Sequence, residues 1–230
     1  MALIRKPGIV LRLRAPVLAA VYLRQLYFTG VQAAALAALA GAMMAWVFFN
    51  ILHGRFHNDS DLTLRILSTI GLQELAPVTV TLLLVARSVS AVVTELASMR
   101  VSGEIRTLLR HGIDPIEYLV APRAVGFILG SALLFVYFAA GALLAGGFLA
   151  VPGHPLAELY RLAQNVPAQP LKHGILRCMT FSASVAVAAC ALGINVRERS
   201  TAVPRTAARA VILSLVVLFV FDGIATYLNE

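Results

Sequence analysis

Three charged residues within an otherwise apolar stretch are the side chains best placed to carry chemistry. Glu74, Arg87 and Glu95 lie between Gln73 and Arg100 among mostly aliphatic neighbours. A charge inside an apolar helix is costly unless it is paired or faces a polar cavity. Such residues therefore hold helices together, contact a cargo or form an ion pathway.

The positions of the three charges divide them into two groups. Arg87 and Glu95 follow one another at helical steps of four through Ala91, so they share one face of a helix. We expect them to be structural or gating charges that satisfy neighbouring helices. Glu74 stands beside Pro77, where a helix should kink, and with Gln73 it is the better candidate for contacting cargo.

The chain contains no pattern of an enzyme active site. It lacks an H-E-x-x-H zinc motif, a Gly-x-Ser-x-Gly elbow and paired intramembrane aspartates, and we expect no metal or cofactor in this chain. Its two lysines, Lys6 and Lys172, follow Arg5 and Leu171, so it has no phosphate-binding loop. If ATP drives its work, another chain must hydrolyse it.

The composition predicts an integral membrane protein. The chain has 230 residues, of which 60% are hydrophobic and 13% are charged, whereas a soluble domain is about 25% charged. At about 20 apolar residues per helix, the length allows five spans in one domain. Cys178 and Cys190 should lie about 18 Å apart along one helix, too far for a disulfide.

The fold expected is all-α, with an interfacial helix followed by five spans. Residues 1–26 are basic and amphipathic, which favours a helix lying in the interface over a simple lead-in to the first span. Residues 27–230 form a single transmembrane domain. The spans are expected at about 27–52, from 62 to 98 with an interruption at Pro77, and at 116–150, 174–196 and 207–228.

A short amphipathic segment separates the second and third spans. Within residues 99–122, which we call the elbow, the apolar positions are Ile105, Leu108 and Leu109, and the polar ones include Glu104, Arg106 and Arg110. Asp114 and Pro115 then begin the next helix, because an acid caps its amides and proline suits a first turn.

The distribution of basic residues orients the chain. Thirteen lie on the side of the N-terminus, the elbow and the loop near residue 200, four lie on the other side, and Arg87 and Arg177 complete the nineteen within spans. Positive residues collect on the cytoplasmic side. The N-terminus and the elbow are therefore predicted to be cytoplasmic, and the C-terminus to be outside.

Several motifs along the chain carry a resemblance to a known family. They are Arg24-Gln25-Leu26-Tyr27 with Gly30, Glu74-Leu75-Ala76-Pro77, Arg87 with Glu95-Leu96 and Met99-Arg100-Val101, and Gly112-Ile113-Asp114-Pro115 with Tyr118-Leu119 and Pro122-Arg123. In these the chain resembles the MlaE-type (YrbE-like) permeases, membrane subunits of ABC transporters that move phospholipid or similar lipids between membranes.

The resemblance implies a set of partners and roles. It implies a homodimer in the inner membrane, two cytoplasmic ABC ATPases that hold ATP and Mg, a periplasmic MCE-domain protein, and room for a small cytoplasmic STAS-type accessory subunit; no nucleic acid is involved. Phe48, Phe49, Gln73 and Glu74 would contact the lipid. The residues that would couple to the ATPase are Glu104, Ile105, Arg106, Leu108, Leu109 and Arg110.

The chain departs from the family pattern in a few places. Arg106 is a base where an acid is usual, Arg177 replaces a lysine, and Val203-Pro204 replaces a glycine-rich turn. Two functions other than a lipid-transport permease also fit the residues. One is a secondary transporter or channel that uses the intramembrane charges. The other is a membrane scaffold for a periplasmic lipid-binding protein.

Overall fold

The computed structural model describes residues 27, 29–53, 66–112, 114–150, 168–196 and 202–228. Within these ranges all regular secondary structure is helical. The predicted interfacial helix at 1–26 lies outside the described residues.

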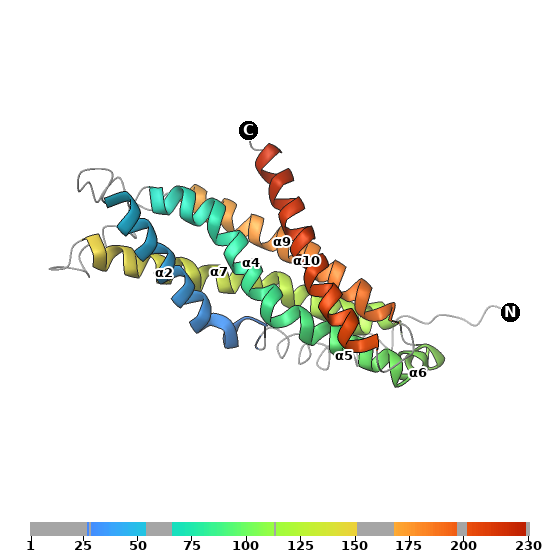
Figure 1. The fold of residues 1–230 in the computed structure, drawn as a ribbon. Coiled ribbons are helices and arrows are strands. Elements are labelled where there is room, and N and C mark those ends of the chain that lie inside the picture. Colours follow the sequence, from blue (N-terminus) through green and yellow to red (C-terminus); the bar gives the residue numbers. More distant parts are fainter. Residues whose placement is uncertain are drawn as a thin grey trace, which may run out of the picture.

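The described helices give five spans, as the sequence predicted (Figure 1). Their apolar stretches are Val31–Leu52, Thr69–Val101, Ile116–Leu149, Gln169–Ile194 and Val203–Tyr227. In chain order the elements are η1 Val31–Ala33, α2 Ala34–His53, η2 Leu67–Leu75, α4 Ala76–Leu84, η3 Val85–Val89, α5 Ser90–Val101, α6 Glu104–Arg110, η4 Ile116–Val120, α7 Ala121–Ala150, α9 Ala168–Ile194 and α10 Ala202–Leu228.

Two helices begin earlier than the sequence predicted, and both contain a proline near their start. α9 begins at Ala168 instead of 174, and α10 begins at Ala202 instead of 207. Pro170 and Pro204 lie in the first turns. Since first-turn amides have no partner within the helix, a proline there costs no hydrogen bond. The segment Val203-Pro204 is therefore the start of a helix and not a turn.

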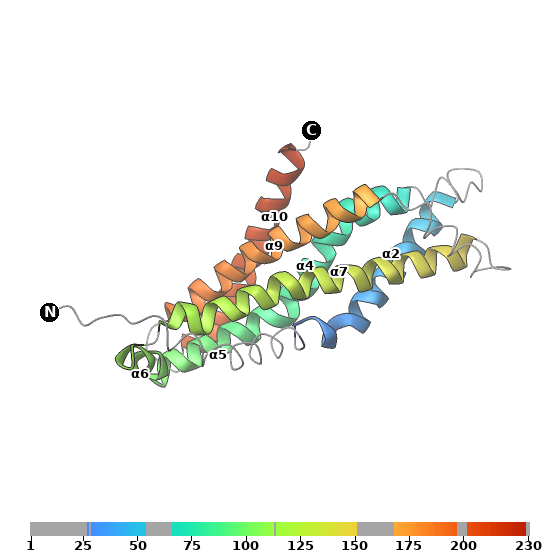
Figure 2. The same cartoon turned by 180° about the vertical axis from the view of Figure 1, so that it is seen from behind.

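The second span changes helix type around Pro77. η2 is π-helical, and α4 follows at Ala76 with Pro77 in its first turn. Helical structure continues through the proline, and both views show the span changing direction along α4 (Figures 1 and 2). The predicted interruption is thus a bend, and a π-helical segment absorbs the misfit.

The first and third spans are packed backbone against backbone. A Cβ atom added to Gly41 on α2 would lie 2.0 Å from the carbonyl oxygen of Phe138, and one added to Gly141 on α7 would lie 2.1 Å from that of Ala38. Only glycine permits such an approach, so small residues join α2 to α7 as expected in membrane bundles.

Serine hydroxyls and buried phenylalanines join the third and fourth spans. Ser131 on α7 and Ser182 on α9 are both fully buried, and their Oγ atoms lie 2.7 Å apart. The largest fully buried side chains include Phe127, Phe135 and Phe181.

α10 packs on α9 and α5, and its C-terminal part extends away from the other helices (Figures 1 and 2).

The bundle has two distinct ends. The end of α2, the start of η2, the end of α7 and the start of α9 lie together, and α6 lies at the opposite end (Figures 1 and 2). The predicted cargo residues and the predicted coupling residues therefore belong to opposite ends of one bundle.

Candidate functional site

An ion pair joins the second and fourth spans in the half of the bundle away from α6. Arg177 on α9 donates through Nη1 to Oε2 of Glu74 on η2. The Arg177 side chain is 9% exposed, whereas the Glu74 side chain is 39% exposed. The base therefore lies inside the protein, and the acid partly faces outward.

Arg177 has further binding capacity that the described residues do not use. Its Nε and Nη2 atoms are buried without a hydrogen-bond partner among the described residues. Asp222 on α10 is within electrostatic range of Arg177 and Glu74, and Gln73 is half-buried beside Glu74. A guanidinium with unused N–H groups binds phosphate or carboxylate oxygens in a forked geometry, so Arg177 has donors left for an acceptor other than Glu74.

The two phenylalanines of the first span take different positions. Phe49 is 5% exposed and belongs to the chain's own core. Phe48 is half-buried and packs against that core, while its neighbours Trp46 and Val47 are exposed. Both predicted lipid contacts therefore lie against the bundle, and the outward face of α2 is formed by other apolar side chains.

Arg87 and Glu95 each bind a residue of another span. Arg87, in the π-helical segment η3, donates through Nη2 to Oε1 of Gln32 at 2.6 Å. Arg123, in the first turn of α7, places Nη2 2.9 Å from Oε1 of Glu95. These contacts favour the structural role predicted for the two charges. Together with the Glu74–Arg177 pair they make three separate pairs instead of one connected path.

The elbow contains a short helix between two left-handed glycines. α6 follows Gly103, with φ of 81°, and precedes Gly112, with φ of 72°. Asp114 begins the next helix by accepting the Ile116 N–H at 2.9 Å, as the sequence predicted. A helix is therefore present where the coupling helix was predicted, and its coupling role stays a prediction.

The side chains of α6 point to two sides. Ile105 is 1% exposed and packs in the chain's own core, Leu108 packs against that core, and Leu109 is 56% exposed. Arg106 and Arg110 are exposed, and Glu104 accepts a hydrogen bond from Ser102 Oγ at 2.9 Å. Ile105 thus anchors α6 to its own bundle and does not present an apolar surface to another chain.

The sequence did not single out the partners Arg177 and Arg123. Arg123 was noted only as part of a family pattern, and Arg177 only as part of that pattern and as a base within a span. The available signal was physical: a base inside an apolar helix requires an acid at the same depth. Glu74 and Arg177 both lie near the outer ends of spans, and Glu95 and Arg123 both lie near the elbow, but only the packing of the helices decides which pairs form.

Comparison with known proteins matches almost the whole chain to one family. The family model described as Permease MlaE matches residues 22–228. A probable ABC transporter permease protein of Rickettsia conorii is 26% identical, over 94% of this chain and 85% of the relative. The intermembrane phospholipid transport system permease protein MlaE of Haemophilus influenzae is 24% identical, over 98% of this chain and 86% of the relative.

A plant protein is also similar. The chloroplast protein TRIGALACTOSYLDIACYLGLYCEROL 1 of Arabidopsis thaliana is 28% identical, over 65% of this chain and 44% of the relative. The family match spans all five apolar helices and both ion pairs, Glu74–Arg177 and Glu95–Arg123. The chain therefore belongs to the MlaE family of ABC transporter permeases, multi-pass membrane subunits of transporters and not enzymes.

Proposed function

We propose that this chain is the membrane subunit of an ATP-driven transporter that moves phospholipid, or a similar lipid, between two membranes. Two copies form the transmembrane part in the inner membrane, with the N-terminus and the elbow in the cytoplasm and the C-terminus in the periplasm. The Haemophilus influenzae relative is named as an intermembrane phospholipid transport system permease, and this supports the substrate class.

One observation carries the substrate proposal: Arg177 is buried with two unused nitrogen atoms at an acid-containing cluster. A phospholipid presents a phosphate next to long acyl chains. The guanidinium offers donors to the phosphate, Glu74 and Gln73 offer acceptors to an ammonium or hydroxyl of the headgroup, and the apolar spans accept the chains. Phe48 and Phe49 support the acyl-chain wall from behind.

The elbow supplies the connection to the energy source. Two cytoplasmic ABC ATPases with ATP and Mg would bind at α6 through Leu109, Arg106 and Arg110, which face outward. Ile105 and Leu108 would hold α6 on the bundle so that the push reaches the spans. A periplasmic MCE-domain protein would receive or deliver the lipid, and a STAS-type subunit would bind on the cytoplasmic side.

The experiment that tests this function is reconstitution of the chain with its ATPase and MCE-domain partners in liposomes. Transfer of a fluorescent phospholipid between donor and acceptor vesicles is followed with ATP, with ADP and with a proton gradient alone. We expect transfer only with ATP. Transfer that follows the proton gradient without nucleotide would establish the secondary transporter, and lipid binding without any transfer would establish the scaffold.

The structure gives the ion-pathway alternative little support. The three charges on the second span bind three different partners: Glu74 binds Arg177, Arg87 binds Gln32, and Glu95 binds Arg123. A relay needs groups that exchange a proton or ion with one another. Separate pairs between helices instead serve to hold the spans in place.

A further inference from the structure

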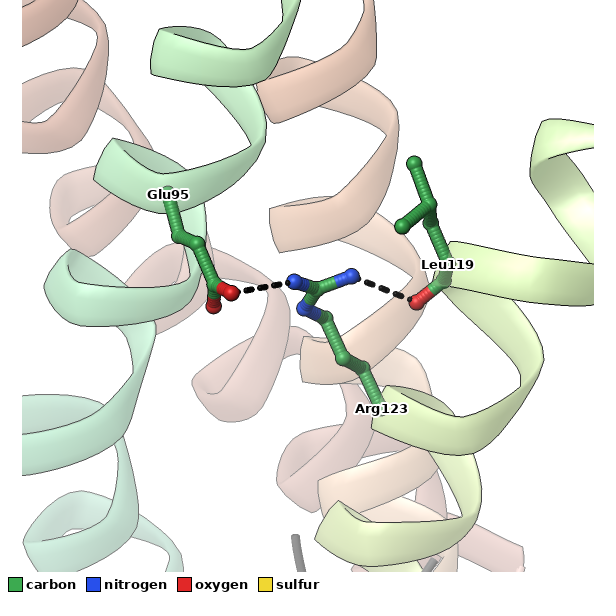
Figure 3. Close-up of polar contacts among 3 residues, drawn as sticks. All are labelled: Glu95, Leu119 and Arg123. Carbon is green, nitrogen blue, oxygen red and sulfur yellow. Dashed lines mark hydrogen bonds and ion pairs between the residues drawn. The ribbon is translucent and has the colours of Figure 1, made fainter. Parts of the chain in front are cut away.

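The two spans that flank α6 are joined by an ion pair close to the elbow (Figure 3). Figure 3 shows the side chain of Arg123 extending from α7 toward Glu95 on the neighbouring helix α5. The distance from Arg123 Nη2 to Glu95 Oε1 is 2.9 Å. Glu95 lies near the end of the second span, and Arg123 lies near the beginning of the third, so the pair closes the elbow across its base.

Arg123 also binds the segment through which the elbow enters the third span. Its Nη1 donates to the carbonyl oxygen of Leu119 at 2.8 Å (Figure 3). Leu119 belongs to η4, which is π-helical. Such short π-helical segments are rare and interrupt the regular hydrogen-bond ladder of a helix. One guanidinium thus connects α5, η4 and α7.

The junctions of α6 itself are built to turn. Gly103 and Gly112 adopt left-handed conformations, and a side chain added at either position would meet open space. Ile105 is the residue of α6 that is fully enclosed by the bundle. A displacement of α6 could be taken up by bending at the two glycines and in η4. It would then not move the second and third spans unless those spans were fixed to one another.

The burial of the pair makes its partners dependent on each other. The Arg123 side chain is 9% exposed, whereas the Glu95 side chain is 55% exposed. Removing the acid leaves a buried cation whose counter-charge, within the described part of the chain, is gone. Water can still reach Glu95, so the pair can be weakened without opening the core.

We propose that Glu95 and Arg123 are positioning residues for energy coupling, which fix α5 to η4 and α7 so that a displacement of α6 moves the second and third spans together. The mechanical part of this inference concerns this chain alone. The coupling part rests on the proposed function, because it requires an ATPase that pushes on α6.

Hydrogen–deuterium exchange of the full-length protein in lipid nanodiscs tests the mechanical part. In Glu95→Gln, which keeps the shape of the side chain, amides of residues 102–120 should exchange at least fivefold faster, while those of α9 keep their rates. The control is Thr94→Ala, which removes an exposed polar group from the adjacent position of α5. Unchanged exchange in residues 102–120, or a uniform increase over all spans, would overturn the inference.

A second variant separates the two contacts of Arg123. Arg123→Lys keeps a cation for Glu95, but a compact ammonium on a flexible stem cannot at the same time donate to the Leu119 carbonyl as the forked guanidinium does, so only the Leu119 contact should be lost. Faster exchange should then be confined to η4. If Arg123→Lys loosens α6 as much as Glu95→Gln does, the charge pair is not what fixes the elbow, and the proposal fails.

The coupling part is measured in the complex with its ATPase. In Glu95→Gln we expect ATP hydrolysis within twofold of the parent rate and lipid transfer lowered at least fivefold, so that more ATP is used per lipid. Equal losses of both, or of neither, would overturn the coupling role. A parent complex that moves no lipid would refute the proposed function, and the exchange result would still decide whether the ion pair fixes the elbow.

Discussion

At the scale of single residues, the buried bases of this chain have more donors than the described residues use. Arg177 pairs with Glu74 through one nitrogen and leaves two nitrogens buried without a partner. A hydrogen bond to a charged group is worth about 1.5–3 kcal/mol, and a buried unsatisfied donor costs about 1–3 kcal/mol. An anionic ligand that reached these two nitrogens would remove that cost, and the proposed headgroup contact rests on this.

Replacing Arg177 by alanine should remove the headgroup contact. We expect the affinity of the purified protein for phospholipid to fall roughly a hundredfold, because two charge-assisted hydrogen bonds are lost, each worth about 1.5 kcal/mol after exchange with water. Native mass spectrometry measures the bound lipid. The control is Lys172→Ala, which removes an exposed base from the same helix. Equal lipid content in Arg177→Ala and the parent would contradict the headgroup assignment.

The sequence predicted the residue types of this site and not their partners. Glu74 was selected because it stands beside Pro77 near the outer end of its helix. Its partner Arg177 is 103 positions away, and no local pattern connects the two. The partner of Arg123 could not be predicted for the same reason. The burial of Ile105 could not be predicted either, because Ile105, Leu108 and Leu109 have the same apolar character and only the fold decides which of them faces inward.

At the scale of the elements, α2 and α7 make the closest glycine contact among the described helices. Gly41 and Gly141 each face a backbone carbonyl of the other helix at a distance that no side chain can enter. Van der Waals contact between closely packed helices drives association in a membrane, where the hydrophobic effect between spans is absent. The two glycines therefore fix the first span to the third.

Replacing Gly141 by alanine should separate these helices and destabilise the bundle. The new methyl group meets the carbonyl of Ala38, and overpacking of this kind costs about 1–3 kcal/mol. Unfolding in mixed micelles measures the loss. Gly223→Ala is the matched control, since its methyl group meets open space and alanine favours the helix by about 1 kcal/mol. A Gly141→Ala protein as stable as the parent would show that α2 and α7 are not held by this contact.

The outward side of α6 should be required for the ATPase. Replacing both Arg106 and Arg110 by glutamate puts negative charges on the surface at which the proposed ATPase would contact two bases. We expect coupled ATPase activity to fall at least tenfold. The ATPase rate of the reconstituted complex is the measurement, and Tyr137→Phe on the exposed face of α7 is the control. Full coupled activity in the doubly reversed variant would exclude docking at this surface.

Helix boundaries show where composition misleads at this scale. The five spans follow from apolar length alone, and all five are present. α9 and α10 begin six and five residues before the spans predicted from apolar length, because the proline-containing residues ahead of each apolar stretch are already helical. The sequence alone does not distinguish a proline in the first turn of a helix from a proline in a loop. The difference lies in whether its missing N–H was needed.

At the scale of the whole molecule, the two proposed functional regions lie at opposite ends, and the helices α2 and α10 carry apolar outward faces. The outward faces of α2 and α10 expose large apolar side chains such as Leu39, Met43, Val216 and Phe219. In a membrane these faces contact lipid or the second copy of the proposed dimer. The cationic elbow and the Arg177 cluster thus stand on opposite sides of an apolar belt.

Thiol labelling tests the predicted orientation. Cys178 and Cys190 are free and buried, so the parent should not react with an impermeant maleimide. Leu109→Cys, at a 56% exposed position of α6, should react only in inside-out vesicles. Tyr227→Cys, at a 79% exposed position near the end of α10, should react only in right-side-out vesicles. The reverse pattern would invert the orientation and move the elbow away from the cytoplasmic ATPase.

The close contact between α2 and α7 has a consequence for biogenesis. A ribosome makes α2 about a hundred residues before Gly141 exists, and the second span emerges between them. During that interval α2 sits in the bilayer without the helix that receives its glycine face, and only then can it dock. α2 is therefore inserted before the helix on which it packs has been made. A chain truncated before α7 should leave α2 available for capture by membrane quality-control proteases.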